Sequence, residues 1–442
     1  MKIVHVLNHF LPHQTAGTEV YTWALVKALY AIGIKGCVVI PNYGKKENAT
    51  YLYDGIEVYQ YAETSVVDRS LIMGKRPPDG LPYFEQLLQQ LQPDIVHFHE
   101  LAGSNGITVA HVTVAKALSI KVVMTFHLAG YTCKTGNLMY MGNTLCGGTI
   151  QTNNCSACYL YSRGLGAKAK WLLPVSGALY QLGIDSTKWN HQLGTALGTQ
   201  QLIVQLQQQF TKLVNACDAV VSLTSWYRQI LLNNGALKHK LWHIPQGLPS
   251  VSKATPPTIV PVTLPIKCLF VGRISAFKGL HLLLQAIMAL PKEAVRIDIY
   301  GASNDDGYAQ HWQQATAAFP NIAWKGTLPQ QDVVPTMQQY HLLCLCSTFS
   351  EMSPLVIQEA FAARLPVIAS NVYGNAEQIQ HGVNGWLFPF NNVAALTQQL
   401  AQLINEPALI DKARLQIVSP FGFDRLAENY KQVYAHLLTN TE

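Results

Sequence analysis

Length, composition and charge exclude several classes of protein. The chain has 442 residues, of which 49% are hydrophobic and 13% are charged. This composition excludes a disordered protein, and the length exceeds what one hydrophobic core usually supports, so we expect two folded domains. The net charge of +6 is too dilute for nucleic-acid binding, in which basic residues gather in a stripe.

The sequence contains no membrane-spanning pattern. A spanning helix needs roughly 18 to 20 apolar residues, and the chain opens directly into a strand pattern rather than a signal peptide. We therefore expect a cytoplasmic protein. Residues 1–250 carry 19 Lys/Arg against 12 Asp/Glu, and this surplus is compatible with peripheral contact with the anionic inner face of a membrane.

Short β-rich runs alternate with helical patterns in the first half of the chain. The strands predicted there are KIVHVLN (2–8), DIVHFH (94–99), KVVMTFH (121–127) and AVVSLT (219–224). Such alternation predicts a parallel sheet with helices on both faces.

A second series of the same kind follows, with strands predicted at 266–273, 295–301, 341–347 and 365–370. Between the two series, residues 248–265 contain five prolines and have the composition of a linker. The predicted fold is α/β, with two Rossmann-like, doubly wound parallel-sheet domains (1–247 and 266–422) facing across a cleft. A helix at 423–442 is predicted to return to the first domain. Ligands bind at the carboxyl ends of strands in such domains.

The loop GRISAFKG (272–279) places two cations at the carboxyl end of a predicted strand, directly after Gly272. Arg273 offers a planar fork to phosphate oxygens and Lys278 a mobile point charge, so together they can neutralise a diphosphate without a metal ion. The alternative is an ordinary basic loop at the start of a helix.

The segment SEMSPLVIQEA (350–360) predicts the start of a second helix. Ser353 is the predicted N-cap and Pro354 suits the first helical position. The free amides that follow, at Leu355 and Val356, would form an anion site at the strand end.

Two glutamates bracket this helix start, with seven residues between them. Together with VGRISAFKG, the strand LPVIAS and the run GNAEQIQHGVNGWLF (374–388), they make the chain resemble the family 4 glycosyltransferases, which have the GT-B fold. The resemblance implies a retaining transfer of a sugar from a nucleotide diphosphate donor, a UDP- or GDP-sugar, to a hydroxyl of a glycan or lipid-linked acceptor. It also implies a role in polysaccharide or glycoconjugate assembly and no catalytic metal.

The resemblance assigns roles to the matching residues. Glu351 would contact hydroxyls of the donor sugar and Glu359 those of the ribose, while Arg273 and Lys278 would hold the diphosphate. The family often has Gly-Phe-Gly after the first glutamate, where this chain has Met-Ser-Pro. This departure leaves the identity of the donor open.

In the first domain, the loop 9–17 ends at Gly17 and leads into a helix predicted to begin at Thr18. The resemblance places this loop over the donor phosphates, whereas the alternative is that Gly17 only permits a turn. His127 ends the run TFH, and the resemblance places it near the donor sugar. For His97 and His99 we expect structural roles as polar residues at a strand end.

Four of the nine cysteines fall within one segment, at intervals of twelve, eight and two residues: Cys133, Cys146, Cys155 and Cys158. This spacing is compatible with a structural zinc site, and equally with free thiols or a redox pair. The segment belongs to a predicted Cys-bearing, helical insertion of about 130–213.

Two other functions remain open on the sequence. A nucleotide-sugar epimerase on the same fold would need its own acid and base groups near the sugar. A non-catalytic sugar-nucleotide-binding protein would bind the donor without turnover. A dehydrogenase is disfavoured, because no G-x-G-x-x-G motif follows a predicted strand.

Overall fold

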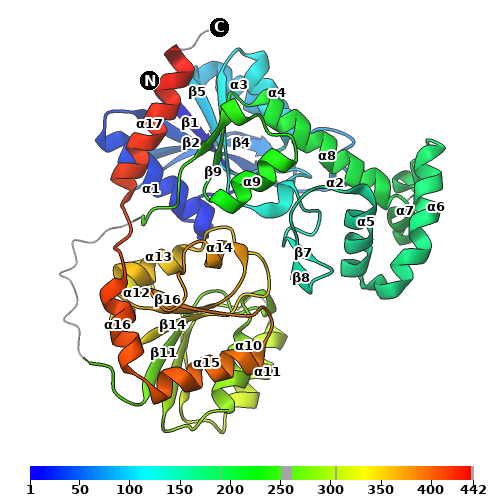
Figure 1. Cartoon of the computed structure of the whole chain (residues 1–442). Coiled ribbons are helices and arrows are strands. Elements are labelled where there is room, and N and C mark those ends of the chain that lie inside the picture. Colours follow the sequence, from blue (N-terminus) through cyan, green and yellow to red (C-terminus); the bar gives the residue numbers. More distant parts are fainter. Residues whose placement is uncertain (190, 250–260, 304–305, 440–442) are drawn as a thin grey trace. The chain divides into compact units, whose positions relative to one another are not determined.

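The computed structural model describes residues 1–189, 191–249, 261–303 and 306–439 (Figure 1). The chain divides into two compact units. Unit 1 comprises Met1–Gly142, Cys146–Pro249 and Phe423–Glu442, and unit 2 comprises Asn143–Leu145 and Ser250–Gly422. Most of the predicted linker, 248–265, lies outside the described residues.

Unit 1 is built on an eight-stranded sheet with the order β10-β9-β6-β5-β1-β2-β4-β3. Neighbouring strands are parallel except for the antiparallel pair β3 and β4. The strands are β1 Lys2–Val6, β2 Lys35–Tyr43, β3 Ala49–Tyr53, β4 Ile56–Glu63, β5 Ile95–Phe98, β6 Lys121–Phe126, β9 Ala219–Ser222 and β10 Leu241–His243.

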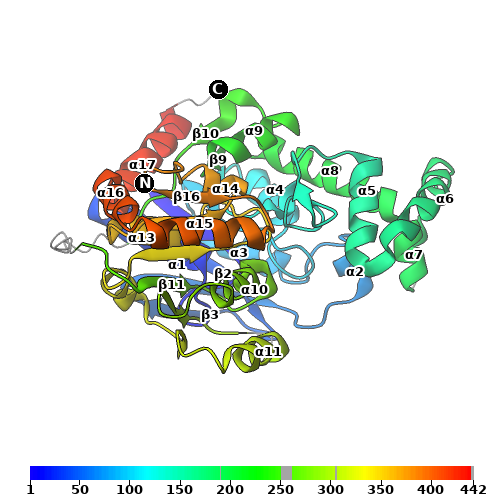
Figure 2. The ribbon, with the colours of Figure 1, turned by 60° about the horizontal axis from the view of Figure 1, so that its bottom comes forward.

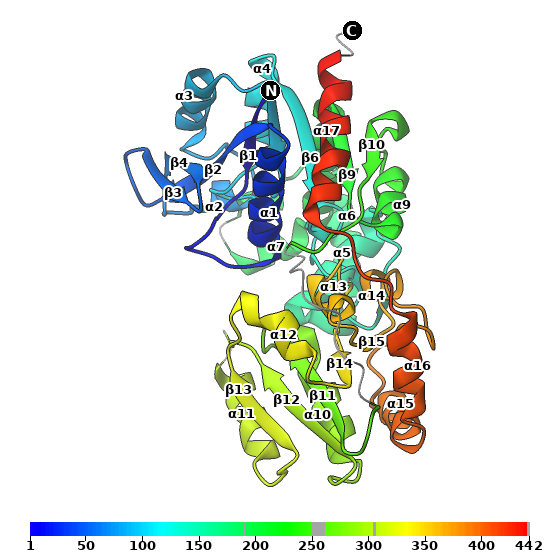
Figure 3. The ribbon, with the colours of Figure 1, turned by 90° about the vertical axis from the view of Figure 1, so that its left-hand side faces the viewer.

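The central strands of this sheet are buried along almost their whole length, as β5 and β6 show, because helices cover both faces. The helices of unit 1 outside the insertion are α1 Gly17–Ala31, α2 Arg69–Ile72, α3 Leu81–Leu91, α4 Val109–Ala117, α9 Ser225–Asn233 and the C-terminal α17 Phe423–Thr439. Helix α17 lies beside α1 (Figure 3), and the hydroxyls of Tyr21 and Tyr430 meet at 2.9 Å.

An insertion follows β6 and, except for Asn143–Leu145, belongs to one edge of unit 1 (Figure 2). It begins with the two-stranded sheet β7 (Met139–Tyr140) and β8 (Thr144–Leu145). Four helices follow: α5 Thr152–Leu160, α6 Ala169–Gln181, α7 Gln192–Leu197 and α8 Thr199–Ala216. Helices α5, α6 and α8 pack against one another, and α7 packs on α6.

Unit 2 contains a six-stranded, all-parallel sheet with the order β13-β12-β11-β14-β15-β16. Its strands are β11 Ile266–Val271, β12 Val295–Tyr300, β13 Ile322–Gly326, β14 Leu342–Leu345, β15 Val367–Ser370 and β16 Gly385–Phe388. Its helices are α10 Leu280–Met288, α11 Asp306–Thr316, α12 Val333–Met337, α13 Leu355–Ala362, α14 Tyr373–Ala376, α15 Val393–Asn405 and α16 Ala408–Gln416.

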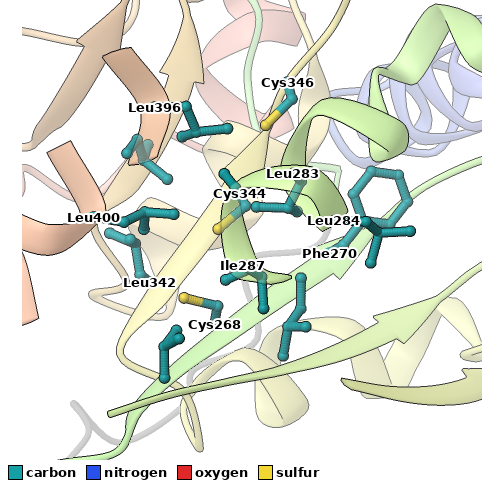
Figure 4. Close-up of a cluster of buried hydrophobic side chains, with 14 of the residues drawn as sticks. Cys268, Phe270, Leu283, Leu284, Ile287, Leu342, Cys344, Cys346, Leu396 and Leu400 are labelled. Carbon is teal, nitrogen blue, oxygen red and sulfur yellow. The ribbon is translucent and has the colours of Figure 1, made fainter. Parts of the chain in front are cut away.

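One core of unit 2 lies between the sheet and the helices α10 and α15 (Figure 4). Three cysteines, Cys268 on β11, Cys344 on β14 and Cys346 just after β14, are fully buried in this core beside leucine and isoleucine side chains. They pack there as small apolar residues.

The predicted fold class is confirmed, since both units carry parallel sheets flanked by helices. The strands end up to two residues before the predicted limits, which leaves Gly272, Arg273 and His127 in loops. Within the described part of the chain, no helix combines the length and hydrophobicity that crossing a bilayer requires.

Candidate active site

The loop after β11 is held in place by glycine. At Gly279 the backbone has a φ of 65°, and a Cβ there would lie 1.8 Å from the carbonyl oxygen of Cys346. Only glycine fits this contact, which joins the loop to the end of β14. The turn Ala276–Lys278 just before it therefore lies next to the loop that carries Glu351.

Lys278 and Glu351 form an ion pair, with Nζ and Oε1 2.6 Å apart. The Ser347 hydroxyl also donates to Oε1, at 2.6 Å. The Glu351 side chain is only 8% exposed, so these two partners replace the hydrogen bonds that water would otherwise make to it. Arg273 is exposed, and none of the ion pairs among the described residues includes it. The loop thus presents one engaged cation and one cation without a carboxylate partner.

Helix α13 begins at Leu355, close to the predicted start, but its cap differs from the prediction. Pro354 itself is the N-cap residue, with extended backbone, and no side chain caps the helix. The predicted cap at Ser353 is therefore wrong, because the chain enters the helical conformation one residue later than expected. The first amides of the helix, at Leu355 and Val356, consequently have no side-chain acceptor at the cap.

Glu359 lies in the second turn of α13 and is almost fully buried. The Gln330 side-chain amide donates to its Oε1 at 2.6 Å. Burial raises the pKa of the Glu359 carboxyl, and the hydrogen bond from Gln330 partly offsets this effect. The Glu359 carboxyl can thus accept hydrogen bonds from a ligand, and Gln330, from the segment after β13, holds it in one orientation.

A cavity of about 270 Å³ opens beside Glu359 at the carboxyl ends of β11, β12 and β13. Its lining combines backbone at two glycines, apolar side chains and four hydrogen-bonding side chains: Val271, Gly272, Tyr300, Gly301, Ala302, Thr327, Leu328, Gln330, Val333, Val356 and Glu359. Of the predicted site residues, Gly272, Val356 and Glu359 line it. Arg273, Lys278 and Glu351 do not.

In unit 1, His127 follows directly after β6. Its Nε2 lies 3.3 Å from Nδ1 of His99, and its ring packs edge-on against Tyr21 with the centroids 4.7 Å apart. Burial lowers the pKa of His127 to about 3, so the imidazole is neutral at physiological pH. It can donate or accept a hydrogen bond but does not carry a positive charge.

Gly17 is the first residue of α1, so the helix begins one residue before the predicted start at Thr18. A Cβ at Gly17 would meet no atom within 4 Å. Packing within the chain therefore does not require glycine at this position, and the backbone stays open to a ligand.

Three buried histidines have ring nitrogens within 4.8 Å of one another, namely His5, His97 and His99. Both nitrogens of His97 are engaged, with the Tyr434 hydroxyl at 2.7 Å and the Thr125 hydroxyl at 2.8 Å. Nδ1 of His5 is 3.0 Å from Nε2 of His99. These rings form a hydrogen-bonded network with α17.

The four cysteines of the insertion are free and half-buried. Burial raises the pKa of Cys155, and the neighbouring thiols of Cys146, Cys133 and Cys158 raise it further. The four side chains are therefore electrostatic neighbours. Their sulfur atoms do not form a group of three within 4.8 Å.

Comparison with known proteins agrees with this geometry. Residues 15–144 match the family model described as Glycosyltransferase Family 4, and residues 261–417 match the model described as Glycosyl transferases group 1. The chain belongs to the family 4 glycosyltransferases. The two matched regions hold, respectively, Gly17 with His127 and the whole cavity of unit 2.

Relatives of this glycosyltransferase are distant. An uncharacterized glycosyltransferase of Haemophilus influenzae is 27% identical over 274 residues, which cover 58% of this chain and 71% of that protein. Several further relatives match over about half of their own length.

Solved structures share the fold. Sucrose-phosphate synthase from Thermosynechococcus elongatus aligns over 100% of both chains with a TM-score of 0.68 and 16% identity. Anabaena HepE in complex with UDP-glucose aligns over 99% of both chains with a TM-score of 0.60 and 14% identity.

The sequence did not identify several residues of the cavity. Tyr300 ends β12, Gly301 directly follows it, and Gln330 follows β13, far along the chain from the two glutamates. One signal could have identified them, namely the rule that ligands bind at the carboxyl ends of parallel strands. The rule would have had to be applied to every strand of the sheet, and not to β11 and β14 alone.

Proposed function

We propose that this glycosyltransferase moves a sugar from a nucleotide diphosphate donor, a UDP- or GDP-sugar, to a hydroxyl of a glycan or lipid-linked acceptor. The transfer would retain the anomeric configuration and need no catalytic metal. The observation that carries the proposal is the cavity of unit 2, where Glu359 and Gln330 lie beside an uncapped helix start. The complex of the structural neighbour HepE with UDP-glucose supports a UDP donor.

The cavity suits a nucleoside. Apolar side chains such as Val271 and Leu328 offer contacts for a flat base. The buried carboxylate of Glu359 would accept hydrogen bonds from ribose hydroxyls, in the orientation that Gln330 fixes. Charge-assisted hydrogen bonds of this kind are stronger than neutral ones.

The diphosphate would lie next to the nucleoside, against the amides of Leu355 and Val356 at the start of α13. Arg273 would add a charged fork from the loop after β11. Lys278 has three donors, so it can bind a phosphate oxygen while it keeps its bond to Glu351.

These groups support a dissociative transfer. As the bond between the anomeric carbon and the diphosphate oxygen breaks, negative charge grows on the leaving group, where Arg273 and Lys278 stabilise it. The acceptor hydroxyl would attack from the same face and give its proton to the departing phosphate oxygen. Glu351 would hold hydroxyls of the donor sugar, and the neutral His127 would orient the sugar by a hydrogen bond rather than act as a base.

We also infer that the insertion contacts a membrane that carries the acceptor. Residues 130–213 contain six Lys/Arg and one acidic residue, Asp185, which pairs with Lys75 at 2.7 Å. Large apolar side chains there are strongly exposed, with Trp171 at 83% and Leu182 at 73%. Apolar anchors in basic surroundings suit an anionic bilayer surface.

Flotation with lipid vesicles tests this contact. The protein should float with vesicles that contain phosphatidylglycerol and less with neutral phosphatidylcholine vesicles, and salt should weaken the binding. The double change Trp171→Ser and Leu182→Ser should abolish flotation. Leu52→Ser removes an equally exposed leucine of unit 1 outside the insertion and should have no effect. Equal flotation of the double variant would contradict the proposal.

A donor screen tests the central function. UDP-, GDP- and ADP-sugars would be compared by thermal shift and by slow hydrolysis, in the presence of EDTA, on the wild type and on Glu359→Ala. One donor should stabilise the wild type and release its nucleotide, and the variant should lose both effects. NMR of the transferred product should show the anomeric configuration of the donor.

The same screen separates the alternatives. An epimerase would change the configuration of the sugar without an acceptor, and a binding protein would be stabilised without turnover. No response to any nucleotide sugar would refute the proposal.

A further inference from the structure

The cysteines of this chain fall into two groups with different surroundings. Five are buried in the cores of the two units: Cys37, Cys217, Cys268, Cys344 and Cys346. The other four, in the insertion, are half-buried and lie within 26 residues of one another. Packing accounts for the first group but not for the second, because a half-exposed thiol adds little to a core.

The insertion brings these four cysteines together from two local elements. Cys133 and Cys146 flank the β7–β8 sheet, and the amide of Cys146 donates to the carbonyl of Leu138 at 2.9 Å. Cys155 and Cys158 lie three residues apart on α5, so their side chains share one face of the helix. The amide of Met141 donates to Cys158 Sγ at 3.2 Å, which joins the two elements through sulfur.

Backbone amides point at sulfur on both helical cysteines. Besides the bond from Met141, the amide of Gln151 donates to Cys155 Sγ at 3.3 Å. These two bonds hold both sulfur atoms of the helical cysteines in place against the backbone that precedes α5.

We propose that Cys133, Cys146, Cys155 and Cys158 bind one zinc ion as a structural tetrathiolate site, which fixes the β7–β8 sheet to α5. Four thiolates and no open position are typical of structural zinc, and soft sulfur ligands select it over calcium or magnesium. Because no three of the sulfur atoms lie within 4.8 Å of one another in this structure, the cysteine side chains must turn inward on binding.

The site would steady the loop that carries His127. Cys133 comes six residues after His127, and the turn between them is tied down at Tyr131, whose hydroxyl accepts from the amide of Leu101 at 2.8 Å. A zinc ion directly after this turn would fix the chain on its other side. The inference goes beyond the proposed donor chemistry, because all four cysteines belong to unit 1 and the cavity to unit 2.

Metal analysis of the purified full-length protein tests the inference. We expect about one zinc per chain by mass spectrometry. After removal of the zinc, cobalt(II) should restore binding with the visible spectrum of a tetrahedral thiolate site. Cys155→Ala and Cys158→Ala should lose the metal, whereas Cys344→Ala, which removes a core thiol of unit 2, should keep it.

Three results would overturn the inference: no metal in the wild type with four thiols that react freely, a disulfide between Cys155 and Cys158, or zinc retained by both insertion variants. If a variant does not fold, reversible release of zinc from the wild type by a thiol-modifying reagent provides the same test. Stabilisation by the donor reports separately on unit 2, so failure of the zinc site and failure of the proposed function can be distinguished.

Discussion

At the scale of single residues, Gln330 is a residue of the candidate site that lies outside the sequence motifs. Its amide holds Glu359, so we call it a positioning residue. Gln330→Ala removes one hydrogen bond, worth about 0.5–1.5 kcal/mol, and should raise the KM for the donor about 2- to 12-fold. The value of kcat should change little, because a contact with the nucleoside is equal in the ground and transition states.

Steady-state kinetics of Gln330→Ala checks this split between KM and kcat. Gln313→Ala is the matched control, since Gln313 is an exposed glutamine of unit 2 on α11. A fall in kcat with KM unchanged would show that Gln330 acts on the reacting centre instead.

Arg273 and Lys278, the two cations of the loop after β11, differ in their surroundings. Their replacement should therefore differ in its effect on stability. Arg273→Ala should lower kcat by about 10²- to 10³-fold and leave the free energy of unfolding within about 0.5 kcal/mol. Lys278→Ala should lower kcat similarly and also destabilise unit 2 by about 1–3 kcal/mol, because it leaves the buried Glu351 carboxylate without its ion-pair partner.

Kinetics and urea unfolding of both variants test this contrast, with the exposed Lys292→Ala as control. Equal stability of the Arg273 and Lys278 variants would mean that the ion pair with Glu351 contributes nothing to the fold.

At the scale of elements, the sequence predicted the strands well and the helix starts less well. Strands such as β1 and β11 are predominantly apolar and largely buried, a pattern typical of a parallel sheet covered on both faces. The start of α13 was misplaced because serine at 353 is a good N-cap residue in general, whereas here the extended backbone continues through Pro354.

The contact of α17 with the sheet also could not be predicted in detail. The amphipathic pattern indicated a packed helix, but periodicity does not reveal which buried polar groups it meets. Tyr434 reaches His97, and Tyr430 reaches Thr125 and Tyr21. These partners come from three different elements, which only the folded chain brings together.

Tyr434 therefore gives a prediction for this element. Tyr434→Phe leaves Nδ1 of the buried His97 without its partner and should lower the free energy of unfolding by about 1–3 kcal/mol. Urea unfolding measures the effect. Tyr83→Phe removes the same hydroxyl from an exposed tyrosine of unit 1 and should change stability by less than about 0.5 kcal/mol. Similar values for the two variants would contradict a structural role for the network.

At the scale of the whole molecule, two parallel sheets followed directly from the alternating pattern, and the glycosyltransferase family followed from motifs in unit 2. The cavity did not, because its wall combines three loops that sequence separation keeps apart and the order of strands brings together. Local patterns specify elements, whereas a site depends on the topology of the sheet.

Acid should destabilise unit 1, because several of its histidines are buried in the neutral form. Burial lowers the pKa values of His5, His111 and His127 from 6.5 to about 3. Above about pH 6.5 neither the folded nor the unfolded chain protonates these groups, so their contribution to stability is fully present. Below that pH these histidines bind protons in the unfolded chain but not in the folded chain. Their contribution to the free energy of unfolding is therefore lost as the pH falls toward 3.

Each such histidine should lower the free energy of unfolding by about 1.4 kcal/mol per pH unit. The three together should therefore lower it by about 4 kcal/mol per unit below pH 6. The buried carboxyls Glu19 and Glu63 have raised pKa values and oppose part of this loss. Urea unfolding at pH 7, 6 and 5 measures the slope. His111→Gln should make it shallower, whereas His239→Gln, at an exposed position, should leave it unchanged. A slope that does not respond to His111→Gln would mean that the buried imidazoles are not the source of the acid sensitivity.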